Sequence, residues 1–287
     1  MLRTRVVTAL ILLALVVPAL AFLPANGWAL FVLAFVAAAA WEWARLCGLP
    51  QALSLGYAAL TAVAGMAILL GVREHEHAVT LWVYAISAIT WGGIASWWFF
   101  RGPAAPRGGW LAALGWLVLI PCWWAVVQAR MAGALFMFLL MGLIWVADIG
   151  AYFAGRRFGR HKLAPAVSPG KTWEGVAGAM VGAGLLALLC AATTSATGSP
   201  LDSWFAWIFG YAGRLGPPGV LVALLTVCVV VGLSILGDLF ESLLKRRAGV
   251  KDSSALLPGH GGVLDRIDSL IPAMPLAMLI FSFVRSA

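Results

Sequence analysis

Long runs of apolar residues alternate with short polar connections along almost the whole chain. Each run is close to the 20 or so residues that a helix needs to cross a hydrocarbon core about 30 Å thick. The pattern predicts nine membrane-spanning helices, near residues 6–24, 27–44, 53–72, 78–100, 109–127, 131–154, 173–192, 218–240 and 267–284. The expected fold is therefore an all-α polytopic membrane protein.

Composition supports this interpretation and excludes a soluble domain. The mean hydropathy is +0.98, 63% of residues are hydrophobic and only 10% are charged, whereas roughly 25% of residues are charged in soluble domains. No repeat or separate soluble domain is evident. We expect a membrane scaffold over residues 1–130 and a catalytic membrane domain over 131–287, with polar loops at 155–172 and 242–267.

Positive charge predicts the orientation, because short cytoplasmic loops retain Lys and Arg. With the N-terminus inside, fifteen of the 19 Lys and Arg residues fall on the cytoplasmic side. The C-terminus then lies outside. The first run also resembles a signal peptide, with Ala19-Leu20-Ala21 as a cleavage site. Since its removal would invert the charged loops, we interpret it as an uncleaved first span.

Several smaller features of the apolar segments carry structural expectations. Aromatic clusters at 97–100, 123–124 and 204–209 are typical of membrane interfaces. The polar run 73–77 contains two His, which could bind a metal, but a solvated turn is the simpler interpretation. Glycines of the span at 173–192 are expected to mark close helix packing; they are Gly175, Gly178, Gly182 and Gly184. The four Cys lack metal-site spacing and should be small buried side chains.

Chemistry-bearing residues begin in the sixth predicted span. Asp148, Tyr152 and Gly155 are spaced i, i+4 and i+7, so they share one helix face. A carboxylate facing lipid would cost about 3 kcal/mol, so Asp148 should face the bundle or a water-filled cavity. A structural hydrogen bond to a neighbouring helix is the alternative.

The segment Ser168-Pro-Gly-Lys171-Thr172-Trp-Glu174-Gly contains a Gly-Lys-Thr triplet but is not a P-loop. A P-loop has a glycine where this chain has Pro165, and it follows a strand. Two interpretations stay open. Ser168, Lys171 and Thr172 could bind phosphate at the start of the next helix, or Thr172 could cap that helix with Glu174 in its first turn.

Ten of the 30 charged residues lie between Gly237 and Asp268. If the preceding helix continues, Asp238 and Lys245 share a polar stripe, and Asp265 and Asp268 lie one turn apart. A Gly-rich loop at 258–262 separates these groups. Carboxylates suit Mg²⁺, and Lys or Arg can neutralise phosphate charge. The stretch therefore indicates phosphoryl chemistry at the membrane surface.

The same stretch resembles the signature of the phosphatidate cytidylyltransferases, also called CDP-diacylglycerol synthases. Its S-x-x-K-R (242–246), K-D (251–252), P-G-H-G-G (258–262) and D-R-x-D (265–268) elements follow in the family's order. The segments 148–156 and 168–175 also resemble that family. The resemblance is specific over the second half of the chain and extends to the first half only as hydropathy.

This resemblance implies that CTP and phosphatidic acid give CDP-diacylglycerol and pyrophosphate. It assigns Mg²⁺ to Asp238, Asp265 and Asp268, with room for a second cation such as K⁺. Catalytic roles fall to these aspartates and to the basic side chains Lys245, Arg246, Lys251 and Arg266. The implied substrate-binding residues are Asp148, Tyr152, Ser168, Lys171, Thr172, Glu174, Asp252, His260, Gly261 and Gly262.

The implied location is a bacterial inner membrane with the active site facing the cytoplasm. Its partners would be the two substrates and the bilayer, without nucleic acid, and a homodimer is left open. Other lipid phosphotransferases are disfavoured, because the chain lacks an Asp-Asp dipeptide and a D-G-x-x-A-R motif. A transporter with ion sites at Asp148 and Asp238 is disfavoured because the charges crowd into the second half.

Overall fold

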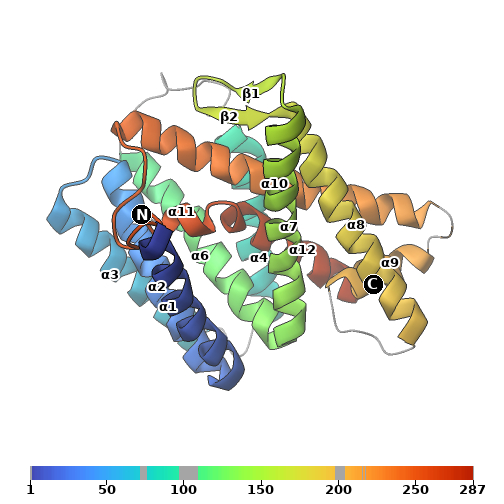
Figure 1. Ribbon diagram of the computed structural model, residues 1–287. Coiled ribbons are helices and arrows are strands. Elements are labelled where there is room, and N and C mark those ends of the chain that lie inside the picture. The colour runs from blue at the N-terminus through green and yellow to red at the C-terminus, as the bar shows by residue number, and fades with distance from the viewer. Residues whose placement is uncertain are drawn as a thin grey trace.

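The chain folds as a helical bundle with one small hairpin of strands, shown in Figure 1. The computed structural model describes residues 2–71, 76–96, 109–197, 204–214, 216 and 218–286. The helices in chain order are α1 Leu2–Phe22, α2 Ala25–Leu46, α3 Gln51–Gly71, α4 Glu76–Ile89 with its π-helical continuation η1 Thr90–Ala95, α6 Gly109–Ala132, α7 Ala134–Phe158, α8 Trp173–Thr197, α9 Trp204–Arg214, α10 Gly219–Ala248, α11 Leu264–Ile267 and α12 Leu270–Ser286.

Within the described ranges, eight helical segments are long and apolar enough to cross a membrane, and the apolar segment Ala78–Gly93 is shorter. This confirms an all-α membrane fold. The shorter segment corresponds to the predicted span 78–100, of which residues 97–100 lie outside the described part. Most of the polar run 73–77 lies outside it as well. The predicted span 218–240 is longer than expected, because α10 continues as a helix through the basic cluster to Ala248.

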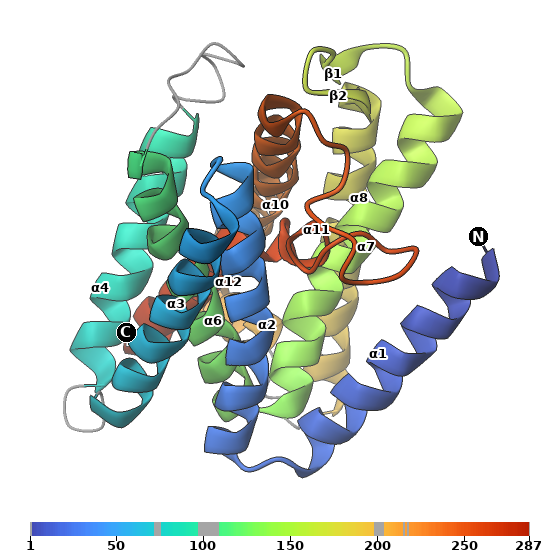
Figure 2. The ribbon, with the colours of Figure 1, turned by 90° about the vertical axis from the view of Figure 1, so that its left-hand side faces the viewer.

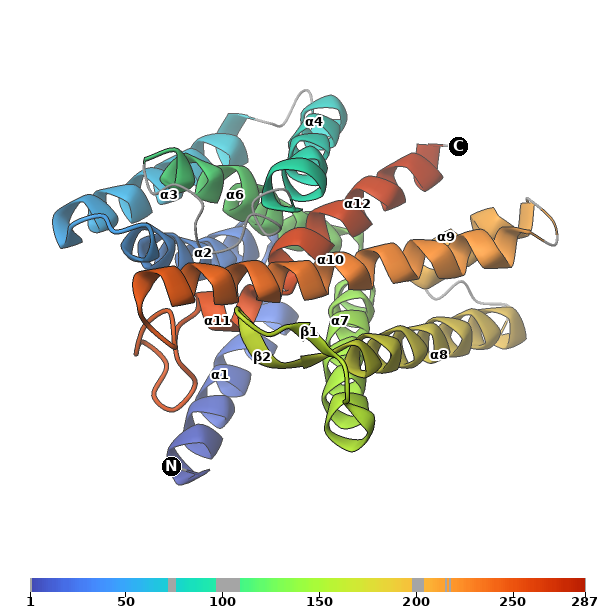
Figure 3. The same ribbon diagram turned by 90° about the horizontal axis from the view of Figure 1, so that it is seen from above.

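The helices are not uniformly parallel. Helix α10 runs across the others, and α1 leans away from the bundle, as Figures 2 and 3 show. Only 6% of the most apolar 18 residues of α1 are buried, whereas 72% are buried in α6, which lies in the interior. The arrangement leaves the C-terminal half of α10 beside α11 and the hairpin.

Tryptophans fill the bundle interior, where their indole N–H groups need acceptors. The indole nitrogens of Trp43, Trp123 and Trp204 each donate to a backbone carbonyl of another helix at 2.9 Å. The expectation of interfacial positions is wrong for Trp123, Trp124, Trp204 and Phe205, which are all buried. Acceptors on other helices satisfy the indole N–H groups of these tryptophans, so the side chains do not need a membrane interface.

Helices α7 and α8 pack closely along small residues. A side chain at Gly150 would clash with the carbonyl of Gly178, at 2.6 Å, and one at Gly178 would clash with Ala154. Gly182 likewise lies against Val146. The predicted glycine packing is confirmed at these positions, but Gly184 faces open space. Close approach holds the C-terminal end of α7 beside the start of α8.

The loop between α7 and α8 contains a hairpin that the sequence did not predict. Strands β1 (Lys162–Ala164) and β2 (Ser168–Thr172) pair antiparallel, with Lys162 opposite Thr172. Ala164 and Val167 pack with Leu239 and Leu243 of α10 in a small apolar cluster. The hairpin therefore packs against the part of α10 that directly follows Asp238, and Figure 3 shows it beside α10.

Candidate active site

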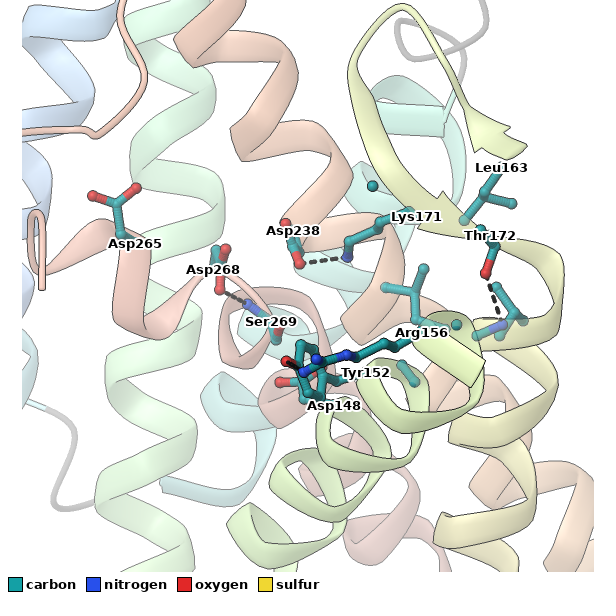
Figure 4. Close-up of a pocket in the computed structure, with 16 residues that line it drawn as sticks. Asp148, Tyr152, Arg156, Leu163, Lys171, Thr172, Asp238, Asp265, Asp268 and Ser269 are labelled. Carbon is teal, nitrogen blue, oxygen red and sulfur yellow. Dashed lines mark hydrogen bonds and ion pairs between the residues drawn. The ribbon is translucent and has the colours of Figure 1, made fainter. Parts of the chain in front are cut away.

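A pocket of about 520 Å³ opens where α7, β2, α8, α10 and the α11–α12 junction meet. Figure 4 shows its charged lining. Seven of the residues implied by the sequence line it: Asp148, Tyr152, Lys171, Thr172, Asp238, Asp265 and Asp268. The fold thus brings together groups that are up to 120 positions apart in the chain.

Asp238 of α10 and Lys171, near the end of strand β2, form an ion pair in the pocket. Their side chains are 29% and 26% exposed. Solvent therefore screens this ion pair in part.

A glycine allows Asp238 to lie close to Asp268. A side chain at Gly237 would collide with the backbone oxygen of Asp268 and would lie 2.7 Å from the Pro272 ring. The helix is interrupted at this point, since α11 ends at Ile267 and α12 begins at Leu270. The Asp268 carboxylate accepts a 2.7 Å hydrogen bond from the Ser269 amide. Asp238 of α10 and Asp268 of the α11–α12 junction therefore both line the pocket.

Asp265 is placed differently from the other two aspartates. Its Oδ1 accepts from Lys245 Nζ at 2.6 Å. Its Oδ2 accepts from the Ser253 amide, the Ser253 hydroxyl and the Gly262 amide, at 2.8–2.9 Å. In Figure 4 its carboxylate points away from Asp238 and Asp268. The structure thus does not bring the three predicted metal ligands to one point.

Lys245 lies between two carboxylates, at 2.6 Å from Asp265 and 2.5 Å from Glu241. Glu241 is only 2% exposed. Removing one partner of a buried ion pair costs several kcal/mol, because the other charge stays buried. Because Lys245 and Glu241 belong to α10 and Asp265 belongs to α11, this cluster joins the two helices beside the pocket.

The capping interpretation of the 168–175 segment is confirmed, and phosphate binding there stays a prediction. The Gly175 amide donates to Thr172 Oγ1 at 3.1 Å, so Thr172 caps α8. Glu174 accepts from the His161 amide and contacts His161 Nδ1 at 2.7 Å, which closes the hairpin. Lys171, which directly precedes Thr172, faces the pocket (Figure 4).

Other predicted residues lie outside the pocket lining. Gly262 and Lys245 contact Asp265, while Arg246 Nε donates to the Val167 carbonyl of the hairpin at 3.3 Å. Gly261 has a positive φ of 83°, and a side chain there would meet the Asp265 carboxylate. The remaining residues are Ser168 in β2, Glu174 at the base of the hairpin, and Lys251, Asp252, His260 and Arg266 around the loop between α10 and α11.

Three residues that the sequence did not assign also belong to the site. Arg156 lines the pocket, and its guanidinium donates to the Tyr152 hydroxyl at 2.9 Å. Ser269 lines it beside Asp268. Glu42 of α2 contacts the loop that holds Asp265. Arg156 lies one turn after Tyr152 on the predicted face, so its spacing was a usable signal.

Asp148 lies in the pocket lining, as its position on the polar face predicts. Within the described ranges, no hydrogen bond ties its carboxylate to a neighbouring helix. The structural alternative for this residue is therefore not supported.

The oxygen donors fit a divalent cation that arrives with its substrate. No group of three or more His, Cys, Asp or Glu side chains converges as a metal cage among the described residues. Mg²⁺ does not require one, since it usually binds through one or two carboxylates, waters and substrate phosphates. Asp238 and Asp268 are the carboxylates best placed for that role.

The carboxylates and cations that meet in one pocket of this all-α membrane bundle suit phosphate-bearing substrates. The model of the cytidylyltransferase family matches residues 3–284. The chain is 42% identical to the phosphatidate cytidylyltransferase of Pseudomonas aeruginosa, over 96% of this chain and 95% of that protein.

Other relatives agree. Identity to the phosphatidate cytidylyltransferase of Haemophilus influenzae is 34%, over 99% of this chain and all of the relative. The Bacillus subtilis enzyme of the same name is 41% identical over 50% of this chain and 46% of its own. The chain belongs to the cytidylyltransferase family, as its signature suggested, and is a nucleotidyltransferase.

Proposed function

We propose that the protein transfers the cytidylyl group of CTP to phosphatidic acid, giving CDP-diacylglycerol and pyrophosphate. One observation carries the proposal: a pocket lined by Asp238, Asp268, Lys171 and Arg156 adjoins α7, whose Phe153 and Phe158 side chains are exposed. Such a pocket can receive a water-soluble triphosphate and a lipid phosphate together. The names of the relatives support the same substrates.

The lipid phosphate is best placed at the α7 side of the pocket. Arg156 and Tyr152 are exposed there, and Phe153 and Phe158 on the same stretch of α7 are 64% and 63% exposed. These aromatic rings suit acyl chains, while a guanidinium can bind a phosphate through two parallel hydrogen bonds. The nucleotide triphosphate then lies toward Lys171 and the hairpin.

In the reaction, an oxygen of the lipid phosphate attacks the α-phosphorus of CTP. A new P–O bond forms, the bond to the β-phosphate breaks, and pyrophosphate leaves with its electron pair. No protein base is needed, because a phosphate monoester is already anionic at pH 7. Lys171 and Arg156 hold the two phosphates in reach and offset negative charge in the transition state.

Asp238 and Asp268 would hold Mg²⁺ on the nucleotide phosphates, with Asp265 as the third implied ligand. A bound Mg²⁺ supplies charge stabilisation to the transferring phosphoryl group. A cation held by Asp238 would replace Lys171 as its counter-charge, and the Lys171 ammonium could then contact the triphosphate.

We place the pocket at the cytoplasmic side of a bacterial inner membrane. The distribution of Lys and Arg supports this side, and CTP is a cytoplasmic solute. The bacterial relatives support the membrane. Dimerisation stays an open prediction.

The first test measures CDP-diacylglycerol formed by the purified protein in detergent, with CTP, phosphatidic acid and Mg²⁺. We expect product only when all three are present. Asp238→Asn and Asp268→Asn should each lower kcat by roughly 100-fold, because a charge that stabilises the transition state is lost.

Thermal unfolding of each variant is the control that separates lost chemistry from lost folding. Product from folded wild type without CTP, or none under any divalent cation, would contradict the proposed reaction. Full activity of both folded variants would keep the reaction and reject these two carboxylates.

A further inference from the structure

Glu42 is a fully buried carboxylate in the half of the chain that the sequence marks only as scaffold. It lies on α2, and its exposed fraction is 0%. Burying a carboxylate is costly unless hydrogen bonds or a counter-charge compensate. Among the described residues, the ion pairs of the structure do not include Glu42. Its stabilisation must come from hydrogen bonds.

Four donors surround the Glu42 carboxylate, all from the 253–264 segment, which runs from the α10–α11 loop into the first residue of α11. Oε1 accepts from the Ser254 hydroxyl at 2.5 Å and the Val263 amide at 3.0 Å. Oε2 accepts from the Ser253 hydroxyl at 3.1 Å and the Leu264 amide at 2.6 Å. One side chain thus ties together the two ends of the 253–264 loop. Helices α2 and α11 lie side by side in Figures 1 and 2.

The same loop holds Asp265, and Ser253 joins the two carboxylates. Its single O–H proton is shared between Glu42 Oε2, at 3.1 Å, and Asp265 Oδ2, at 2.9 Å. Asp265 continues the chain of contacts to Lys245 of α10. A side chain at Gly262 would clash with both the Glu42 carboxylate and the Ser253 hydroxyl. The last glycine of the P-G-H-G-G element therefore makes room for Glu42.

We propose that Glu42 is a positioning residue for the reaction: it anchors the loop so that Asp265 and Lys245 keep their places beside the pocket. The inference rests on the proposed function for its kinetic consequence, but the anchoring itself does not. Glu42 does not line the pocket, so it acts through the loop.

Glutamine in place of Glu42 is a sharp test, because it keeps the size of the side chain. Its NH₂ group would face either the Val263 or the Leu264 amide, and two donors cannot bond each other. Glu42→Gln should therefore free one end of the loop. We expect kcat to fall by about tenfold or more with little change in KM for CTP, since the loss of a charge-assisted hydrogen bond is of that size.

Hydrogen exchange measures the anchor without any assay of activity. In Glu42→Gln, a peptide covering residues 251–265 should exchange about tenfold faster, while peptides of α6 stay unchanged. Ser254→Ala, which removes one of the four bonds and does not contact Asp265, should give a smaller change in the same direction. In the double variant the effects should not add, because both changes act on the same contact.

Thr61→Val is the matched control for a purely structural loss. Thr61 is buried and accepts a 2.9 Å hydrogen bond from the Trp116 indole, far from the pocket. It should lower the unfolding temperature but leave loop exchange and kcat unchanged. Unchanged exchange of 251–265 in Glu42→Gln, or faster exchange with normal kcat, would overturn the positioning role. Inactive wild type would reject the proposed function, and the exchange result would still decide the anchoring.

Discussion

Two neighbouring arginines at the end of α7 show how position separates roles that composition cannot. Arg156 lines the pocket and donates to the Tyr152 hydroxyl, and its guanidinium carbon lies 6.0 Å from the Tyr152 ring centroid. Arg157 instead lies over the Phe158 ring, at 5.8 Å, and does not line the pocket. Both are exposed and charged, but only Arg156 lines the pocket in which we propose that phosphate binds.

Arg156→Leu should therefore raise KM for phosphatidic acid by about tenfold, because a charge-assisted hydrogen bond to phosphate is worth roughly 1.5–3 kcal/mol. Arg156→Lys should recover only part of the loss, since an ammonium cannot make two parallel bonds. KM for phosphatidic acid and for CTP would be measured separately. Arg157→Leu is the control, and an equal rise there would point to surface charge in general.

At the scale of elements, α10 decides the geometry of the site. It continues past the expected end of its span, so one helix carries Asp238, Glu241 and Lys245 along a single stripe. It also crosses the α11–α12 junction at Gly237, where backbone packs against backbone. Because α10 approaches the α11–α12 junction so closely here, Asp238 and Asp268 lie in the same pocket.

Gly237→Ala tests that crossing. Alanine favours a helix over glycine by about 1 kcal/mol, but its methyl group would collide with the Asp268 carbonyl and the Pro272 ring. We expect a lower unfolding temperature and a fall in kcat as the two helices separate. Gly232→Ala is matched, because that position on α10 faces open space. If both variants behave alike, helix propensity outweighs the crossing.

At the scale of the molecule, the site lies at one end of the bundle. The hairpin, the C-terminal half of α10 and the start of α8 meet there (Figure 2). The positive loops predict that this end faces the cytoplasm. The α1–α2 connection lies at the opposite end in the same view.

Labelling with a membrane-impermeant maleimide tests the orientation. In a variant whose four native cysteines are replaced, Ala166→Cys on the hairpin should react in inverted vesicles and stay protected in right-side-out vesicles or spheroplasts. Asn26→Cys should show the reverse pattern. Both positions are exposed, so a lack of reaction reports sidedness. The opposite pattern would place the pocket outside.

Much of the protein follows from local sequence. The hydropathy runs determined the helical membrane fold, because each span must satisfy its own backbone hydrogen bonds in lipid. Short spacings determined the shared face of Asp148 and Tyr152 and the signature of the family, and they offered the Thr172 cap as one of two interpretations. These features depend on residues within a turn or a loop of one another, and such patterns can be read directly.

Only the tertiary structure decided how those pieces meet. It buried Trp123 and Trp204 by giving their indoles acceptors on other helices. It left Asp238 and Asp268 facing the pocket and turned Asp265 toward Lys245, although spacing groups Asp265 with Asp268. It joined Glu42 to Ser253, 211 positions away. Contacts across such separations produce no periodic or local pattern, because they arise only when several helices pack together.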